Sequence, residues 1–141
     1  MNRYSYAATL AACEDGGYVV TFRDLPEAIT QGDSLEESLA EASDCLAEAI
    51  AARIDDSREI PEASDAQSNE HRIIVPLQIA LKAALYEAIQ ESGLAKTQLG
   101  EKLGKDEKEI RRILDPHHGT KLPTLETALK ALGKEPELFF G

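Results

Sequence analysis

Two neighbouring arginines, Arg111 and Arg112, are the side chains of this sequence best suited to recognise DNA. They stand between Ile110 and Ile113, so a helix that buries both isoleucines turns most of each arginine outward. A guanidinium group can donate two hydrogen bonds to O6 and N7 of guanine, or it can pair with a phosphate. The segment therefore predicts a helix that lies in the major groove. The alternative reading of both arginines is a solvated helix face.

The residues around this helix supply further candidate DNA contacts. Glu107 and Lys108 are expected on its outer face. Helix N-termini and the loops between helices commonly hold phosphate groups, and several polar residues fall at such positions. The complete predicted DNA-binding set is Thr97, Gln98, Lys105, Glu107, Lys108, Arg111, Arg112, Lys121 and Thr124. His117 and His118 are expected in the loop after the helix, as surface residues and not as metal ligands.

Four short helices between Pro76 and Gly133 are expected to position these side chains. The first runs from residue 77 to the stop signal at Gly93, the second from about 96 to 103, the third follows Asp106, and the fourth begins near Thr124. The residues expected to face inward are Leu77, Leu81, Leu85, Ala88, Ile89, Leu99, Leu103, Ile110, Ile113, Leu114, Leu125, Ala128, Leu129 and Leu132. This spacing favours a helix-turn-helix over a plain helical bundle.

A capping residue and two glycines define the middle of this region. Asp106 is expected to cap the third helix, with Glu109 completing a capping box. Gly104 is expected in a turn with positive φ, which glycine adopts without steric cost. Gly100 is expected where two helices cross so closely that a larger side chain would push them apart.

The charge of the chain is unevenly distributed. The 141 residues carry a formal net charge of −11. Residues 1–76 contain five basic and sixteen acidic side chains, whereas residues 77–141 contain ten of each. All of the excess negative charge therefore belongs to the first half. Two halves of such different charge predict two domains, 1–76 and 77–141, with different partners.

The first half predicts an α+β domain with the order β-β-β-α-β. A Gly-Gly turn at Gly16 separates two β-rich runs and indicates a hairpin, and residues 28–32 indicate a third strand. Ser34 and Glu37 match the capping box of a helix whose expected apolar face is Leu35, Leu39, Ala42, Leu46 and Ile50. Residues 55–71 break all periodicity and predict a loop, and residues 72–76 predict a last strand.

A row of carboxylates follows another face of that helix. Glu37, Glu41, Asp44 and Glu48 advance by four, three and four residues, which places them along one stripe. The simplest reading is a solvated outer face. The alternative is a docking surface for a basic partner, which would relieve the repulsion between like charges at i and i+4. These four residues are the predicted partner-binding set.

Several classes of protein are disfavoured by what the sequence contains. Cys13 and Cys45 have no second ligand at metal spacing, so no metal or other cofactor is expected. No run approaches the roughly 18 apolar residues of a membrane span, and the N-terminus does not read as a signal peptide. A cytoplasmic protein without a membrane partner is therefore expected.

The order of these parts resembles the HicB family of antitoxins, from bacterial HicA–HicB toxin–antitoxin pairs. The resemblance rests on residues 4–54, "YSYAATLAACEDGGYVVTFRDLPEAITQGDSLEESLAEASDCLAEAIAARI", and on residues 92–133, which look like the Cro/repressor-type helix-turn-helix of one branch of that family. It implies a partial ribonuclease-H-like N-terminal domain that sequesters a HicA-type toxin, a small basic protein that cleaves mRNA. It also implies a C-terminal domain that binds the operator DNA of its own promoter and represses it.

Two features of the sequence depart from the pattern of that family. The groove-facing helix carries more acid than most DNA readers, and Gly100 stands where alanine is usual, which would loosen the helix packing.

Enzymes of the ribonuclease H type hold divalent metal with several carboxylates, one of them in the middle of the first strand. The first strand here has no carboxylate before Glu14, so no enzymatic activity is expected. The other alternative is a ligand-sensing helix-turn-helix regulator that is not paired with a toxin. In either regulatory role a homodimer or homotetramer is expected, because such proteins usually read two half-sites.

Overall fold

The chain folds as two units whose boundary lies close to the change in charge. The computed structural model describes residues 4–141, and the chain divides into one unit that ends at Ala80 and a second unit from Leu81 to Gly141. The boundary falls within the first turn of helix α2 (Leu77–Ser92), just after Pro76. Each unit has its own buried core.

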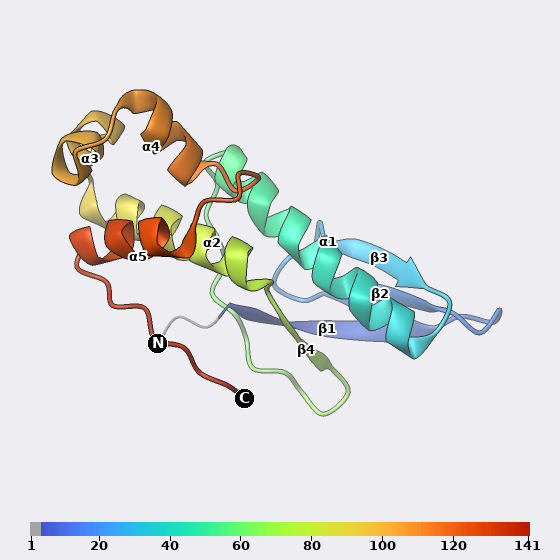
Figure 1. Ribbon diagram of the computed structural model, residues 1–141. Helices are drawn as coiled ribbons and strands as arrows, with labels where there is room; N and C mark the ends of the chain where they lie inside the picture. The colour runs from blue at the N-terminus through green and yellow to red at the C-terminus, as the bar shows by residue number, and fades with distance from the viewer. Residues whose placement is uncertain (1–3) are drawn as a thin grey trace. The chain divides into compact units, whose positions relative to one another are not determined.

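The first unit contains a four-stranded antiparallel sheet (Figure 1). Strands β1 (Ser5–Ala12), β2 (Tyr18–Phe22), β3 (Ile29–Gly32) and β4 (His71–Ile74) lie in the order β3-β2-β1-β4. The predicted hairpin is present, with Leu10 paired with Val20 and with Gly16 at a φ of 93° in its turn. The last strand pairs with β1, so the predicted β-β-β-α-β order and the α+β class are confirmed.

Helix α1 (Leu35–Asp55) packs on this sheet, where it contacts β2, β3 and β4 (Figure 1). The Ser34 side chain accepts a hydrogen bond of 3.1 Å from the backbone N–H of Glu37, as the capping box predicts. The buried face of the helix begins at Ser38 and continues through Leu46 to Ile54. The prediction for Leu35 was wrong, because this side chain is 47 % exposed at the first turn of the helix.

The segment from 56 to 70 contains no helix or strand, as predicted, but it is tied closely to the sheet. The Asp24 carboxylate accepts hydrogen bonds of 2.8 Å from both the backbone N–H and the hydroxyl of Ser64. The Tyr6 hydroxyl donates to the Pro61 carbonyl at 2.7 Å. Arg23 forms an ion pair with Glu70 near the end of the segment. These contacts satisfy the polar groups of a long irregular segment that would otherwise need water.

The second unit is built from helices at the positions that the glycines and caps predict. After α2 come α3 (Lys96–Leu103), α4 (Glu107–Leu114) and α5 (Leu122–Ala131). Gly93, Gly104 and Gly133 all have φ between 66° and 80°, the left-handed region that ends helices. Helix α5 begins two residues before the predicted start at Thr124. The side chains that form the fully buried core are Leu85, Ala88, Leu99, Ile110, Ile113, Leu125, Ala128 and Leu129.

The prediction for Leu77 was wrong. Its side chain is 60 % exposed, because the apolar face of α2 that packs against the other helices begins one turn later, at Leu81. The expected loosening at Gly100 was wrong as well. A Cβ atom at Gly100 would lie 2.8 Å from the Lys105 carbonyl oxygen, so the backbone of the α3–α4 connection packs directly against this glycine.

Gly100→Ala should lower the free energy of unfolding by about 1 kcal/mol. Overpacking typically costs about 1–3 kcal/mol, and the better helix propensity of alanine returns up to about 1 kcal/mol. Urea unfolding of the full chain measures the difference. The matched control is Gly119→Ala, since a Cβ atom there meets nothing within 4 Å. Equal stability of the two variants would contradict the close approach at Gly100.

Candidate functional site

The N-terminal end of α4 is fixed by Asp106. Its carboxylate accepts a hydrogen bond of 2.8 Å from the backbone N–H of Glu109, which is the cap that the sequence predicts. The Glu109 carboxylate lies 3.5 Å from the Lys105 ammonium group, one helical turn earlier. Local structure therefore accounts for two acidic residues at the start of α4, Asp106 and Glu109.

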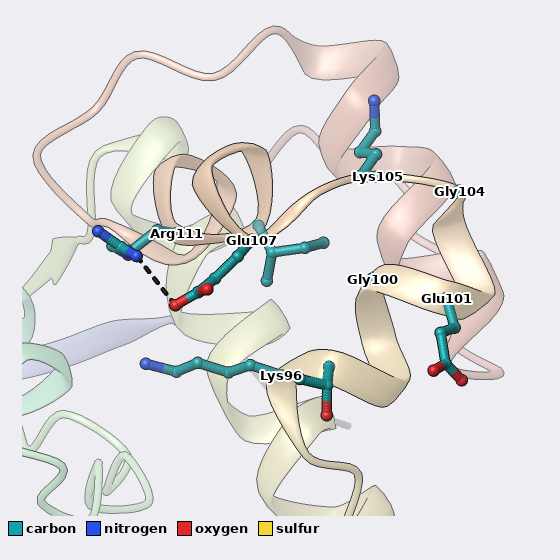
Figure 2. A pocket seen from close by; sticks show the side chains of 9 residues that line it. Lys96, Gly100, Glu101, Gly104, Lys105, Glu107 and Arg111 are labelled. Atoms are coloured by element: carbon teal, nitrogen blue, oxygen red, sulfur yellow. Dashed lines mark hydrogen bonds and ion pairs between the residues drawn. The ribbon is translucent and has the colours of Figure 1, made fainter.

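A hollow of about 620 Å³ lies between α3 and α4 (Figure 2). It brings together four of the predicted DNA contacts: Thr97, Lys105, Glu107 and Arg111. Gly100 and Gly104 form part of its wall. Lys96, at the first position of α3, also lines the hollow and was missing from the predicted set.

Charged groups of both signs meet in this hollow. The Arg111 guanidinium donates a hydrogen bond of 2.9 Å to the Glu107 carboxylate, one turn away on α4. Both side chains are largely exposed, at 69 % and 79 % of their accessible surface. Figure 2 shows the Lys96 side chain extending on the same side of the hollow as this pair. The outer face of α4 therefore presents an ion pair and not an uninterrupted positive surface.

The other predicted contacts lie outside the hollow. Lys108, Arg112 and Lys121 are exposed, and Arg112 has no ion-pair partner within residues 4–141. Gln98 uses its amide oxygen to accept a hydrogen bond of 2.8 Å from the backbone N–H of Ala95, so it caps α3. Thr124 is half-buried within α5.

Lys82 is a structural residue of this unit that the sequence analysis missed. Its side chain is only 2 % exposed, although it is charged and belongs to the amphipathic helix α2. The ammonium group donates hydrogen bonds of 3.0 Å and 2.8 Å to the carbonyl oxygens of Arg112 and Ile113, and one of 2.7 Å to the hydroxyl of Thr120. A cation in this position satisfies the last carbonyl groups of α4 and complements the negative end of its dipole. Lys82 therefore ties the C-terminal end of α4 to α2.

The burial of Lys82 should make stability depend on pH. Desolvation lowers the pKa of Lys82 from 10.5 to about 8, and Asp115 only partly opposes this shift. Between these two values the unfolded chain binds more protons than the folded chain, so the free energy of unfolding rises with pH. The stabilisation is fully present above about 10.5 and is lost as the pH falls through about 8. One pKa unit corresponds to about 1.4 kcal/mol, so the gain is at most about 3 kcal/mol.

Urea unfolding of the full chain at pH 7.5 and pH 10.5 tests this linkage. Lys82→Met, which has a side chain of similar length and no charge, serves as the control because the other lysines, tyrosines and cysteines titrate equally in both proteins. The free energy of unfolding of the original chain should rise relative to that of the variant. The same pH dependence in both proteins would contradict the assignment.

The predicted acidic stripe lies on the exposed side of α1. Glu41, Asp44 and Glu48 are exposed. Glu37 is exposed as well, but its carboxylate accepts a hydrogen bond of 3.1 Å from the backbone N–H of Asp33. Glu37 therefore helps to hold the start of α1, and the other three carboxylates are the ones available to a partner.

Within residues 4–141, no group of three or more histidine, cysteine, aspartate and glutamate side chains is arranged to hold a metal ion. Cys13 and Cys45 are both free thiols, and burial raises the pKa of Cys45. A thiol with a raised pKa is a poor nucleophile at neutral pH. Among the described helices, none is both long enough and apolar enough to span a membrane.

Comparison with known proteins identifies the family. Residues 5–84 match the family described as "HicB_like antitoxin of bacterial toxin-antitoxin system". The chain is 40 % identical over 133 residues to antitoxin HicB of Escherichia coli strain K12, an alignment that covers 94 % of this chain and 96 % of that protein. It is 36 % identical over 130 residues to antitoxin HicB 1 of Photorhabdus laumondii, covering 92 % and 83 % of the two chains. It is also 40 % identical over 125 residues to antitoxin HicB 2 of the same organism, covering 89 % and 88 %. The family match spans more than half of the chain, and these relatives extend the similarity over nearly all of it, so this protein belongs to the HicB-like antitoxin family.

Proposed function

We propose that this protein neutralises a HicA-type, mRNA-cleaving toxin through its first unit and represses its own operon through its second unit. The observation that carries the proposal is the division of charge between two separately folded units in a member of an antitoxin family. A toxin that cleaves RNA would need a positively charged surface to bind it, and an acidic surface complements such a surface. The neutral unit is the one that can approach DNA.

The first unit would have the partial ribonuclease-H-like fold that the resemblance implies. The element order β-β-β-α-β and the successive pairing of β1, β2 and β3 support this assignment. Its role would be binding and not catalysis. The surface we assign to the toxin is the stripe on α1, with Glu41, Asp44 and Glu48 as the charges that it faces.

The second unit would be a helix-turn-helix in which α3 and α4 are the two motif helices. The left-handed Gly104 between them, the close approach at Gly100 and the exposed Arg111 and Arg112 support this assignment. Helix α4 would enter the major groove, and Thr97 and Lys121 would contact phosphates. Two copies of the chain would read two half-sites of the operator.

Reversing Glu41, Asp44 and Glu48 to lysine should slow association with the toxin by tenfold or more at low salt. Electrostatic steering typically changes association rates by about 10 to 10³-fold, and screening by salt reduces the effect. Stopped-flow mixing with the toxin encoded beside this gene, at several salt concentrations, measures the rate.

The matched control reverses three other exposed acids of the same unit: Glu14, Glu62 and Asp65. It changes the net charge equally and leaves the stripe intact. If both triple variants associate at the same rate, the stripe is a solvated face and not the docking surface.

Arg112→Ala should weaken binding to the promoter and leave toxin neutralisation unchanged. A surface substitution of this kind alters stability by less than about 0.5 kcal/mol, so the variant should fold. If Arg112 reads guanine, its loss should cost about 1–3 kcal/mol and relax specificity at one base; if it contacts phosphate, binding should weaken for all sequences. Gel-shift titration at several salt concentrations, beside a toxin-rescue assay, measures both.

Arg112→Lys separates the two roles, because lysine keeps a phosphate contact but cannot form the bidentate pair with guanine. Lys130→Ala, at an exposed position of α5, is the control for the loss of one positive charge. Promoter affinity that is unchanged in Arg112→Ala would exclude this residue from the DNA surface.

A further inference from the structure

We propose that Glu107 is a specificity-determining residue: it weakens binding to DNA in general and accepts a hydrogen bond from the exocyclic amine of a cytosine, while Arg111 donates to a guanine. This inference rests on the proposed DNA-binding function of the second unit. It explains why a helix assigned to the major groove carries an acidic side chain on its outer face.

Glu107 differs from Asp106 at the start of α4, because its carboxylate pairs with the Arg111 side chain and not with the helix backbone. Asp106 caps the helix through the backbone N–H of Glu109, and the Glu109 carboxylate lies beside Lys105. The Glu107 carboxylate instead stands at the exposed first position of α4, with 79 % of its side-chain surface accessible. The first turn of a recognition helix is the part that contacts base edges.

Arg111 lies close enough to Glu107 for the two side chains to act together on DNA. The guanidinium lies 2.9 Å from the Glu107 carboxylate. An exposed pair of this kind is weak, and DNA can separate it or bind beside it without a large loss of stability. Glutamate accepts from N4 of cytosine and arginine donates to O6 and N7 of guanine. Residues one turn apart can therefore read G·C base pairs at neighbouring positions.

The charge balance of the second unit limits its general attraction to DNA. The unit has ten basic and ten acidic side chains, so its general attraction to the phosphate backbone is small. Glu107 reduces this attraction further, because its negative carboxylate lies in the same hollow as the positive side chains of Lys96 and Arg111. The repulsion acts on every DNA sequence, whereas the hydrogen bond to cytosine forms only on the correct one. Glu107 would therefore increase the difference in affinity between the correct sequence and other DNA, and this difference is the specificity.

The test compares Glu107→Ala with the original full chain on the operon's promoter and on unrelated DNA of the same length. Unrelated DNA should be bound more tightly by the variant, with a salt dependence steeper by up to about one released ion. The ratio of the two affinities should fall about fivefold or more, which corresponds to one lost base contact. Selection from a library randomised over the half-site should show the loss of one C·G preference.

Two further variants separate the hydrogen bond of Glu107 from the general effect of removing an acidic side chain. Glu107→Gln removes the charge but can pair with adenine, so selection should shift the preference at that position from cytosine towards adenine. Glu101→Ala removes an exposed acid from the same hollow on α3 and should leave the affinity ratio unchanged. An unchanged ratio in Glu107→Ala, or an equal fall in Glu101→Ala, overturns this inference alone. An original chain that shows no preference for the promoter overturns the proposed DNA-binding function together with it.

Discussion

A carboxylate near DNA is repelled by every phosphate within the screening length, which is about 8 Å at physiological ionic strength. This chain carries eleven more acidic than basic side chains, and it confines all of that excess to one folded unit. The unit that we propose to bind DNA is therefore neutral overall, and the acidic excess belongs to a separate folded unit. A large excess of acidic side chains also suits the first unit to the basic partner that we propose for it.

The neutral unit holds α4 at both ends with few residues. Asp106 caps its N-terminal end, and Lys82 satisfies the carbonyl groups of Arg112 and Ile113 at its C-terminal end. Between α3 and α4, Gly100 allows the Lys105 carbonyl to approach to a distance that a side chain would prevent. These three contacts fix an eight-residue helix that could not be stable alone, since isolated helices shorter than about 12 residues are marginal in water.

The order and ends of the helices and strands could be predicted from the sequence because local chemistry determines them. Ser34, Asp106, Gly104 and the Gly16 turn act within a few residues of their own positions, and each was found as predicted. The exposure of Leu35 could not be predicted, because helical periodicity does not tell where a helix first meets its partner. The same reasoning applies to Leu77.

Lys82 was missed for a different reason. A lysine in a helix is expected to reach solvent, and the three acceptors of Lys82 come from positions at least thirty residues away in the sequence. The pairing of Arg111 with Glu107 was in principle visible as an i, i+4 spacing, whereas the hollow that collects Lys96 and Arg111 required the turn between α3 and α4. Sequence patterns therefore identified charged candidate residues, and only the fold showed which of them line one hollow.

The most direct test of the division of roles is to express residues 1–80 alone and to measure both toxin rescue and promoter binding. The fragment contains the whole sheet and α1, and circular dichroism reports whether it is folded. The account predicts that the folded fragment restores growth in the presence of the toxin and does not shift promoter DNA. A folded fragment that leaves the toxin active, or one that still binds the promoter, would contradict the assignment of the two roles to two units.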